Sequence, residues 1–388
     1  MAAAASWRQI ATLILAGVIA ACQVGKAAVA VPLLQADLGI SLLAASLVVS
    51  VYGLLGAVAG FPAGAEAARF SARTTIVAGL IAVGLGSLAG AMARSGTELI
   101  ATRIAEGCGF LAIALAAPRL IGTLAPPQDR DSALAFWGVH LPAGTAAMML
   151  AAPLLAAYGW RSLWLANGCA ALFYAFVVAW MIAPADESRP AQRAHATSVL
   201  RSPGPVLIAL AFAVYTLHFS ALAGLLPALL VERVGLPVAD AGVISAVTVV
   251  ANACGNLAAG LLLKSRVPLW GIIAGAFVCA GLASLGIFAP GTPATGVALL
   301  AAASLAVTGL VPASVYAAAP MVAPTAALLG ATLGLLVQSS NIGSLIGAAL
   351  LGGLVERLGW SAAPFLFGAI AIAEIAIALR LRALLGAR

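Results

Sequence analysis

Long apolar blocks separated by short polar turns constrain this 388-residue chain more than any other feature of its sequence. Each block has about the 20 residues that a helix needs to cross a hydrocarbon layer of roughly 30 Å. Twelve such blocks follow one another, at residues 9–31, 42–63, 75–93, 99–121, 133–157, 162–183, 204–227, 239–262, 269–288, 294–317, 327–352 and 362–384. We therefore predict an all-α membrane protein with twelve transmembrane helices.

The composition excludes several other classes of protein. Hydrophobic residues make up 63% of the chain and charged residues 8%, whereas a soluble domain has about a quarter charged residues. A chain this poor in charge could not cover its surface in water, so it is not a soluble enzyme, a disordered chain or a nucleic-acid-binding protein. The sequence has no HExxH, GxSxG or P-loop motif, and we therefore expect no enzymatic activity and no cofactor.

Five cysteines lie inside the apolar blocks and form no CxxC pair. We interpret them as small buried apolar residues, not as disulfide partners or metal ligands, and we predict no metal site. Residues 8–22 are similar to a lipoprotein signal that ends at Cys22, but the apolar run continues to Pro32. We therefore expect this segment to be the first transmembrane helix and not a cleaved leader.

Basic residues are distributed unevenly between the two sets of turns. With the N-terminus in the cytoplasm, 13 Lys and Arg residues fall on the cytoplasmic side and 4 on the outer side. Because cytoplasmic loops are enriched in Lys and Arg, this split predicts a bacterial inner-membrane protein with both termini in the cytoplasm. The net charge of +7 is then a topology signal and not a nucleic-acid-binding surface.

The two parts of the chain resemble each other at an offset of about 195–200 residues. The matched features are Pro32 to Gly39 with Pro227 to Gly235, Gly159-Trp160 with Gly359-Trp360, and the basic turn Arg69 and Arg73 with Lys264 and Arg266. Six helices per part predict parallel repeats, namely residues 1–183 and 204–388 joined by a cytoplasmic linker at 184–203. Two such halves can rock about a site near the membrane midplane, as transporters do.

Two motifs resemble those of the major facilitator superfamily. That family has a Gly-x-x-x-Asp-Arg-x-Gly-Arg-Arg turn after its second helix, and this chain retains Gly64, Arg69 and Arg73 but has Ala68 and Ser71 at the acidic and second glycine positions. The resemblance implies a gating role for the three retained residues. The fourth helix carries the related Arg103-x-x-Glu106-Gly motif. The similarity implies the major facilitator fold, with two six-helix halves around a central cavity.

Three longer stretches are similar, more loosely, to the cyanate permease-like branch of that superfamily. They read GKAAVAVPLLQADLGIS in the first helix, APRLIGTLAPPQDRDSALAFWG before the fifth helix, and GLLPALLVERVGL after the seventh helix.

Charged residues inside a transmembrane helix are costly unless they are paired or face water, so we treat each as a candidate site residue. Lys26, with Gln23 one turn before it, is expected to attract and bind an anionic substrate; the alternative is a snorkelling or internally paired lysine. Arg103 and Glu106 are three residues apart and can pair. Either they couple substrate to proton, because a substrate bound to Arg103 would release Glu106 to titrate, or they brace the bundle.

The C-terminal half offers mainly uncharged candidates. Tyr215 and His218, one turn apart in the seventh helix, are expected to bind substrate, and His218 also to relay protons. Amides at one-turn spacing either line the cavity or seal helix contacts: Asn252 with Asn256, and Gln338 with Asn341.

Two further titratable groups lie within the predicted helices. Glu374, in the twelfth helix, is expected to face the tenth or eleventh helix as a protonated, hydrogen-bonded acid, with a cavity role as the alternative. His140, in the fifth helix, is expected to make a structural hydrogen bond.

These residues predict a secondary active transporter for a small organic or inorganic anion, coupled to protons. Lys26 and Arg103 outnumber the one acid beside them, Glu106, and an excess positive charge favours anions over cationic drugs. A drug or metabolite efflux antiporter is the alternative, although Ala152-Pro153 is only a degenerate form of the drug-antiporter motif. A membrane sensor without transport is a more remote alternative. The expected partners are the solute, protons and membrane lipid, with the chain acting as a monomer.

Overall fold

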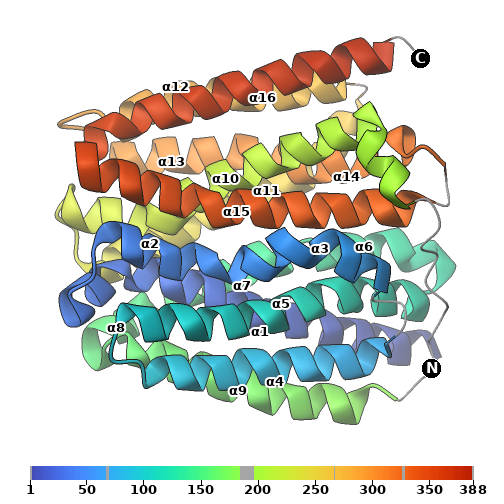
Figure 1. Ribbon diagram of the computed structural model, residues 1–388, viewed down its shortest axis with the longest axis horizontal. Coiled ribbons are helices and arrows are strands. Elements are labelled where there is room, and N and C mark those ends of the chain that lie inside the picture. Colours follow the sequence, from blue (N-terminus) through green and yellow to red (C-terminus); the bar gives the residue numbers. More distant parts are fainter. Residues whose placement is uncertain (1, 67–69, 184–195, 266, 326–327, 387–388) are drawn as a thin grey trace.

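The fold is seen in a computed structural model that describes residues 2–66, 70–183, 196–265, 267–325 and 328–386. Its regular elements in those ranges are helices, which lie side by side along one direction (Figure 1). The N-terminal half contains α1 (Ala2–Leu38), α2 (Leu42–Ser50), η1 (Val51–Gly53), α3 (Leu54–Glu66), α4 (Ala72–Ala91), α5 (Gly96–Leu124), η3 (Pro127–Asp129), α6 (Arg130–Trp137), α7 (His140–Leu150), α8 (Ala152–Tyr158) and α9 (Arg161–Met181). The C-terminal half contains η4 (Ala196–Arg201), α10 (Pro203–Glu232), α11 (Val238–Lys264), α12 (Leu269–Ile287), α13 (Ala294–Thr308), α14 (Leu310–Val322), α15 (Leu329–Leu358), η6 (Trp360–Ala362) and α16 (Ala363–Gly386).

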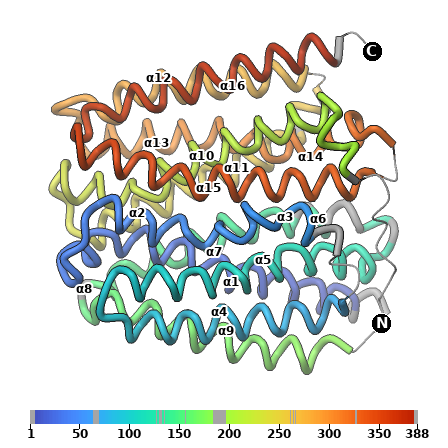
Figure 2. The backbone as a smooth tube through the Cα atoms, in the orientation of Figure 1, coloured from blue at the N-terminus to red at the C-terminus, as the bar shows by residue number. Residues whose placement is uncertain are grey.

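Both ends of the chain lie at the same end of the bundle, as the tube in Figure 2 shows. We call this the terminal end and the opposite one the far end. The helices α4 and α9 pack together at one edge of the molecule, and α12 and α16 pack together at the other (Figure 1). Between these edges, the two halves meet along α2, α3 and α15, and along α7, α8 and α11.

Eleven of the predicted spans are helical stretches long and apolar enough to cross a membrane, counted over the described residues. The exception is the predicted span 133–157, which is broken into the short helices α6, α7 and α8. Pro142 and Pro153 lie in the first turns of α7 and α8, where a missing N–H is tolerated, but a continuous helix would lose a hydrogen bond at each proline. The prediction of twelve membrane-crossing segments holds with this one interrupted.

The sequence suggested that the first and seventh helices end at their prolines, but they do not. The α1 helix continues through Pro32 to Leu38, and α10 continues through Pro227 to Glu232. The matched acids, Asp37 and Glu232, therefore lie in the last turn of each helix. A proline costs a helix one hydrogen bond, and the helices continue through both positions.

The repeat is visible in backbone geometry at the far end. The Gly159 and Gly359 residues have φ of 71° and 76° with ψ of 170° in both cases, a conformation that glycine adopts readily. The tryptophan after each glycine donates to the matched acid, Trp160 Nε1 to Asp37 Oδ2 at 2.9 Å and Trp360 Nε1 to Glu232 Oε2 at 3.2 Å. The sequence pairs that revealed the repeat thus contact each other within each half.

Two details of side-chain placement correct the sequence analysis. The five cysteines are free thiols, but Cys108, Cys169, Cys254 and Cys279 are exposed on the outside of the bundle and not buried. The α16 helix, which carries Glu374, packs mainly on α12 and α10, the ninth and seventh spans, and makes only a minor contact with α15, the eleventh. Because nearly every face of these helices is apolar, the sequence pattern did not reveal which face points inward.

Candidate ion cluster in the N-terminal half

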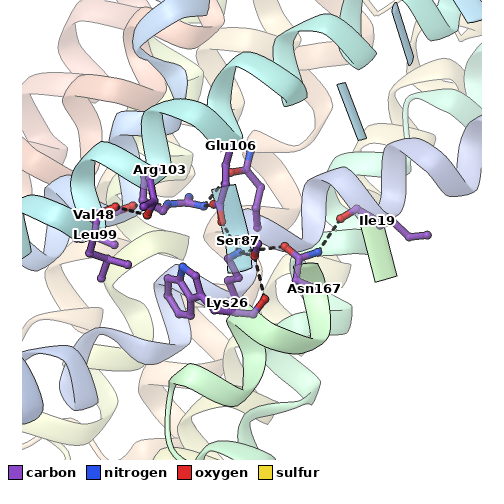
Figure 3. Close-up of polar contacts among 11 residues, drawn as sticks. Ile19, Lys26, Val48, Ser87, Leu99, Arg103, Glu106 and Asn167 are labelled. Atoms are coloured by element: carbon purple, nitrogen blue, oxygen red, sulfur yellow. Dashed lines mark hydrogen bonds and ion pairs between the residues drawn. The ribbon is translucent and has the colours of Figure 1, made fainter. Parts of the chain in front are cut away.

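Three charged side chains meet in the interior of the N-terminal half. Lys26, Arg103 and Glu106 are each 0% exposed, and they come from α1 and α5 (Figure 3). Glu106 accepts from Lys26 Nζ through Oε1 at 2.7 Å and pairs with Arg103 Nη1 through Oε2. With all three groups ionised, the cluster carries two positive charges and one negative charge, a net +1.

Lys26 has no donor left to offer. Besides Glu106, its ammonium group donates to Ser87 Oγ of α4 and to Asn167 Oδ1 of α9, the latter at 3.1 Å. Three acceptors match its three N–H groups. The ammonium also lies 4.9 Å from the ring centroid of Trp164, a favourable cation–π distance. Lys26 is therefore an internally paired lysine that joins α1, α4, α5 and α9, which is the alternative that the sequence left open.

Arg103, in contrast, has donors to spare. Its Nε donates to Val48 O of α2 at 2.9 Å, and its Nη1 donates to Gln23 Oε1 of α1 at 2.8 Å. Among the described residues, neither Arg103 Nη2 nor Gln23 Nε2 has a hydrogen-bond partner, although both atoms are buried. Unpaired buried donors cost about 1–3 kcal/mol each, more when the group is charged. Both unpaired donors lie on hydrogen-bonded neighbours, beside the excess positive charge.

Glycines allow the helices to approach closely enough to form the cluster. A Cβ added at Gly86 of α4 would lie 3.0 Å from Glu106 Cγ, and one added at Gly107 of α5 would collide with the carbonyl of Tyr52. Gly86 belongs to a small-residue motif with Gly90, which contacts Trp164 and Thr102 in the same way. The bare backbones bring η1 and α4 against α5, around the buried charged groups.

The C-terminal candidates form a neutral network in the other half. Tyr215 donates to Asn252 Oδ1 at 3.1 Å, and Asn252 Nδ2 donates to Leu305 O at 2.9 Å. His218 Nε2 lies 3.2 Å from Ser304 Oγ. Its ring packs edge-on against Phe277 and Phe367, whose centroids are 5.5 and 5.1 Å away. Tyr215, His218 and Asn252 thus make contacts between α10, α11 and α13.

Gln338 and Asn341 lie where α15 of the C-terminal half meets α3 and η1 of the N-terminal half. Gln338 Oε1 accepts from Phe61 N at 3.1 Å, and its Nε2 donates to Ala57 O at 2.8 Å. These two backbone groups are four residues apart, so the amide inserts into a turn of α3. Asn341 donates to Val337 O of its own helix and fills the space over Gly56.

The predicted gating residues are described only in part. Arg73 donates through Nη2 to Ala179 O at 2.5 Å, which ties the start of α4 to the end of α9. Gly64 lies within α3, and Arg69 lies outside the described residues. At the far end, Glu356 of α15 accepts from Leu43 N of α2 at 2.8 Å, a link between the halves that the sequence analysis did not anticipate.

Sequence reasoning missed three partners of Lys26, namely Ser87, Asn167 and Trp164. Asn167 is a lone amide within an apolar span, and that isolation is a usable signal. Nothing comparable marks Ser87, because serine is common in membrane helices. Trp164 lies next to the interfacial Trp160 in the same helix but packs inward, 0% exposed.

A cavity of about 550 Å³ lies between the halves toward the terminal end. Its lining includes Trp7, Leu15, Phe136, His140 and, from the C-terminal half, Leu257. His140 makes the structural hydrogen bond predicted for it, with Nδ1 2.7 Å from Trp137 O, and it stacks on the Trp137 ring at 4.0 Å. The ion cluster is not part of this lining.

A bundle of two repeated six-helix halves with a buried ion cluster has the architecture of a solute transporter. The sequence profile of the Major Facilitator Superfamily matches residues 13–327. The chain belongs to this superfamily of membrane transporters, and it is a transporter and not an enzyme.

Two individual proteins of known name are similar in sequence to this chain. The chain is 25% identical to a hexuronate transporter of Bacillus subtilis (strain 168), over 96% of this chain and 94% of that protein. It is 33% identical to the puromycin resistance protein pur8 of Streptomyces alboniger, but over 34% of this chain and 27% of that protein. The similarity to the hexuronate transporter therefore spans both halves, whereas the similarity to the puromycin resistance protein is local.

Solved structures support the fold. A bacterial homologue of the human lysosomal transporter Spinster, in an inward-facing and occupied conformation, superposes with a TM-score of 0.74 at 16% identity, covering 96% of this chain and 92% of that one. The same homologue in an inward-facing and unoccupied conformation gives a TM-score of 0.72 at 16% identity, covering 97% and 93%.

Proposed function

We propose that this protein is a secondary active transporter that moves a small organic anion across the bacterial inner membrane by alternating access, coupled to protons. The observation that carries the proposal is the net +1 cluster with unpaired donors on Arg103 and Gln23. A carboxylate presents two oxygens that can accept both donors, and its charge would balance the cluster. The full-length similarity to a hexuronate transporter supports a sugar acid as the substrate.

In this proposal Arg103 and Gln23 bind the carboxylate, while Lys26 acts indirectly. The three protons of the Lys26 ammonium group go to Glu106, Ser87 and Asn167. Because Glu106 is shared between Lys26 and Arg103, its single negative charge does not fully compensate that of Arg103. The cluster is +1 when empty and neutral with one monoanion bound. A proton added to Glu106 would return the loaded cluster to +1, which a low-dielectric interior disfavours.

The proposal also includes the orientation of the bundle, its division into halves, the gate and the oligomeric state. The end that carries both termini faces the cytoplasm, as the 13 to 4 distribution of basic residues favours. The halves divide at the linker 184–203. They rock against each other, so that the contacts between α3 and α15 and the contacts between α8 and α11 open in alternation. Gly64, Arg69 and Arg73 belong to the gate at the cytoplasmic end, and the chain works as a monomer in lipid.

Ligand-induced stabilisation of the purified protein tests the substrate site. A ligand at about 100 times its Kd stabilises the folded state by about 2.7 kcal/mol, so glucuronate should raise the Tm of the wild type. Arg103→Gln should abolish this rise, and Gln23→Ala should weaken it. Cys108→Ala, on an exposed face of the same helix, is the matched control and should respond like the wild type. If glucuronate still raises the Tm of Arg103→Gln, Arg103 is not the ligand.

A drug or metabolite efflux antiporter is the second candidate function, supported by the local similarity to the puromycin resistance protein. The apolar cavity between α1, α7 and α11 also suits a larger apolar solute. The excess positive charge of the ion cluster opposes a cationic drug. Puromycin in the same assay separates the two candidates: a Tm rise with puromycin and none with glucuronate or other carboxylates would favour efflux.

A further inference from the structure

Glu374 lies at the middle of α16, eleven residues after its first residue and twelve before its last. Its side chain is 0% exposed. Within the part of the chain that the structure describes, neither carboxyl oxygen has a hydrogen-bond partner. The buried face of α16 around it is apolar, consisting of Phe367, Ile370, Ala371, Ala378 and Leu381. Glu374 and Glu106, the two buried acids among the described residues, are thus held in entirely different ways.

The helices packed against α16 bring no described charged partner to this acid. The α12 helix carries Cys279 as its one titratable residue, and that side chain is exposed. From α10, Tyr215 is bonded to Asn252, His218 contacts Ser304, and Glu232 accepts from Trp360 at the far end.

The other neighbouring groups are equally occupied or distant. On α15, Glu356 accepts from Leu43 N, and Arg357 is exposed at the far end. On α16 itself, Arg380 and Arg382 are exposed near the terminal end, with Arg382 over the Trp270 ring. Described residues of η6 include no charged group. Among the described residues around Glu374, no group compensates a negative charge.

An ionised carboxylate in such surroundings would be an unpaired buried charge, which is far costlier than a buried neutral acid. Glu106 contacts two cations, whereas Glu374 contacts none among the described residues. We propose that Glu374 is a proton-binding site of the C-terminal half, which is loaded with a proton in this conformation and releases it during the transport cycle. This inference rests on the proposed proton-coupled function but assigns the proton to a residue outside the substrate site.

Release of the proton from Glu374 requires that water reaches the carboxylic acid. When a rearrangement of α16 against α10 and α12 admits water, the O–H bond of the carboxylic acid breaks, the electron pair stays on the carboxylate, and the proton passes to water. One anion at Arg103 and one proton at Glu374 give a loaded transporter in which both buried sites are neutral. The pair crosses without net charge, and the two halves then carry one cargo each.

Infrared spectroscopy tests the proton at Glu374 without any substrate. A protonated carboxylic acid has a carbonyl stretch separate from that of a carboxylate. The wild type at neutral pH should show this band, Glu374→Gln should lack it, and Glu106→Gln should retain it. Absence of any difference between the wild type and Glu374→Gln would overturn the proposal, whatever the substrate proves to be.

Proteoliposomes with radiolabelled glucuronate test the coupling role. A pH difference of one unit is worth 1.36 kcal/mol, so one proton per anion supports about tenfold accumulation in the wild type. Glutamine is a neutral isostere that cannot release a proton. With Glu374→Gln, the accumulation of glucuronate should therefore fall to about onefold, while counterflow exchange should be retained. Normal accumulation by this variant, or loss of exchange with an unchanged Tm, would overturn the coupling role. Failure of the wild type to move glucuronate would count against the sugar-acid proposal alone, and the infrared result would still decide Glu374.

Discussion

The two halves of this transporter share a scaffold but differ in what they bury at its centre. In the N-terminal half, Lys26, Arg103 and Glu106 form a charged cluster with net +1. In the interior of the C-terminal half, a tyrosine, an amide and a histidine form neutral hydrogen bonds. Gln23 of the first cluster and His218 of the second are 195 residues apart, the offset that also separates Pro32 from Pro227.

The scaffold beneath these two centres is conserved between the halves down to single glycines. Gly107 approaches the carbonyl of Tyr52, and Gly309 approaches the carbonyl of Asn252, in each case between the second and fourth helices of a half. The difference therefore lies in the buried polar groups and not in the packing. In the proposed function, the repeat keeps its architecture while one half binds an anion and the other carries neutral or protonated groups.

The largest effect is expected where the charge difference is greatest. Glu106→Gln would leave Lys26 and Arg103 buried without a carboxylate, and removing one partner of a buried ion pair costs about 3–5 kcal/mol. We expect the free energy of unfolding to fall by that amount, as measured by denaturation of the purified protein in detergent.

Glu374→Gln is the matched control in the other half, since it is equally buried and has no ionic partner. A neutral acid replaced by its amide should change the free energy of unfolding by less than about 1 kcal/mol. Equal losses for the two variants would contradict the view that one acid is ionised and the other is not.

The second prediction tests the shared scaffold. Gly107→Ala and Gly309→Ala each drive a methyl group into a backbone carbonyl that cannot rotate away, and overpacking of this kind costs about 1–3 kcal/mol. The two losses should agree within about 1 kcal/mol in the same denaturation assay. Gly122→Ala, on α5 with no atom near its Cβ position, should be neutral or slightly stabilising. A loss confined to one half would show that the packing is not symmetric.

Sequence alone predicted the spans and the Arg103–Glu106 pair because both depend on local spacing, and it predicted the repeat because matched residues recur at one constant offset. It did not reveal that Lys26 joins that pair, since this requires the rotation of α1 relative to α5, and helices apolar on every face carry little signal about rotation. It also missed the breaks in span 133–157: Pro142 and Pro153 were visible, but prolines at 32 and 227 leave their helices continuous. Whether a proline breaks a membrane helix depends on neighbours that the sequence does not locate.

The third prediction concerns the boundary between the halves. Gln338→Ala removes two hydrogen bonds between α15 and α3, and hydrogen bonds between membrane helices are worth about 0.6 kcal/mol each. Losing both bonds should destabilise the closed contact by about 1.2 kcal/mol. The ratio of molecules with this contact open to those with it closed should then rise roughly sevenfold. Single-molecule fluorescence between labels on α3 and α15 would measure the shift. Leu350→Ala, on an exposed face of α15, is the control, and it should leave the population unchanged.

The smallest effect is expected in the neutral network. Tyr215→Phe removes one hydrogen bond to Asn252, whose other bond to Leu305 O remains, so the free energy of unfolding should fall by about 0.6 kcal/mol. If Tyr215 only seals the contact between α10 and α11, the affinity for glucuronate should change less than about twofold, whereas loss of a direct ligand hydrogen bond of 1.4 kcal/mol would weaken it about tenfold. Isothermal titration of both proteins distinguishes these outcomes. A tenfold loss would return Tyr215 to the substrate site, as the sequence first suggested, and would mean that the C-terminal half also contacts the anion.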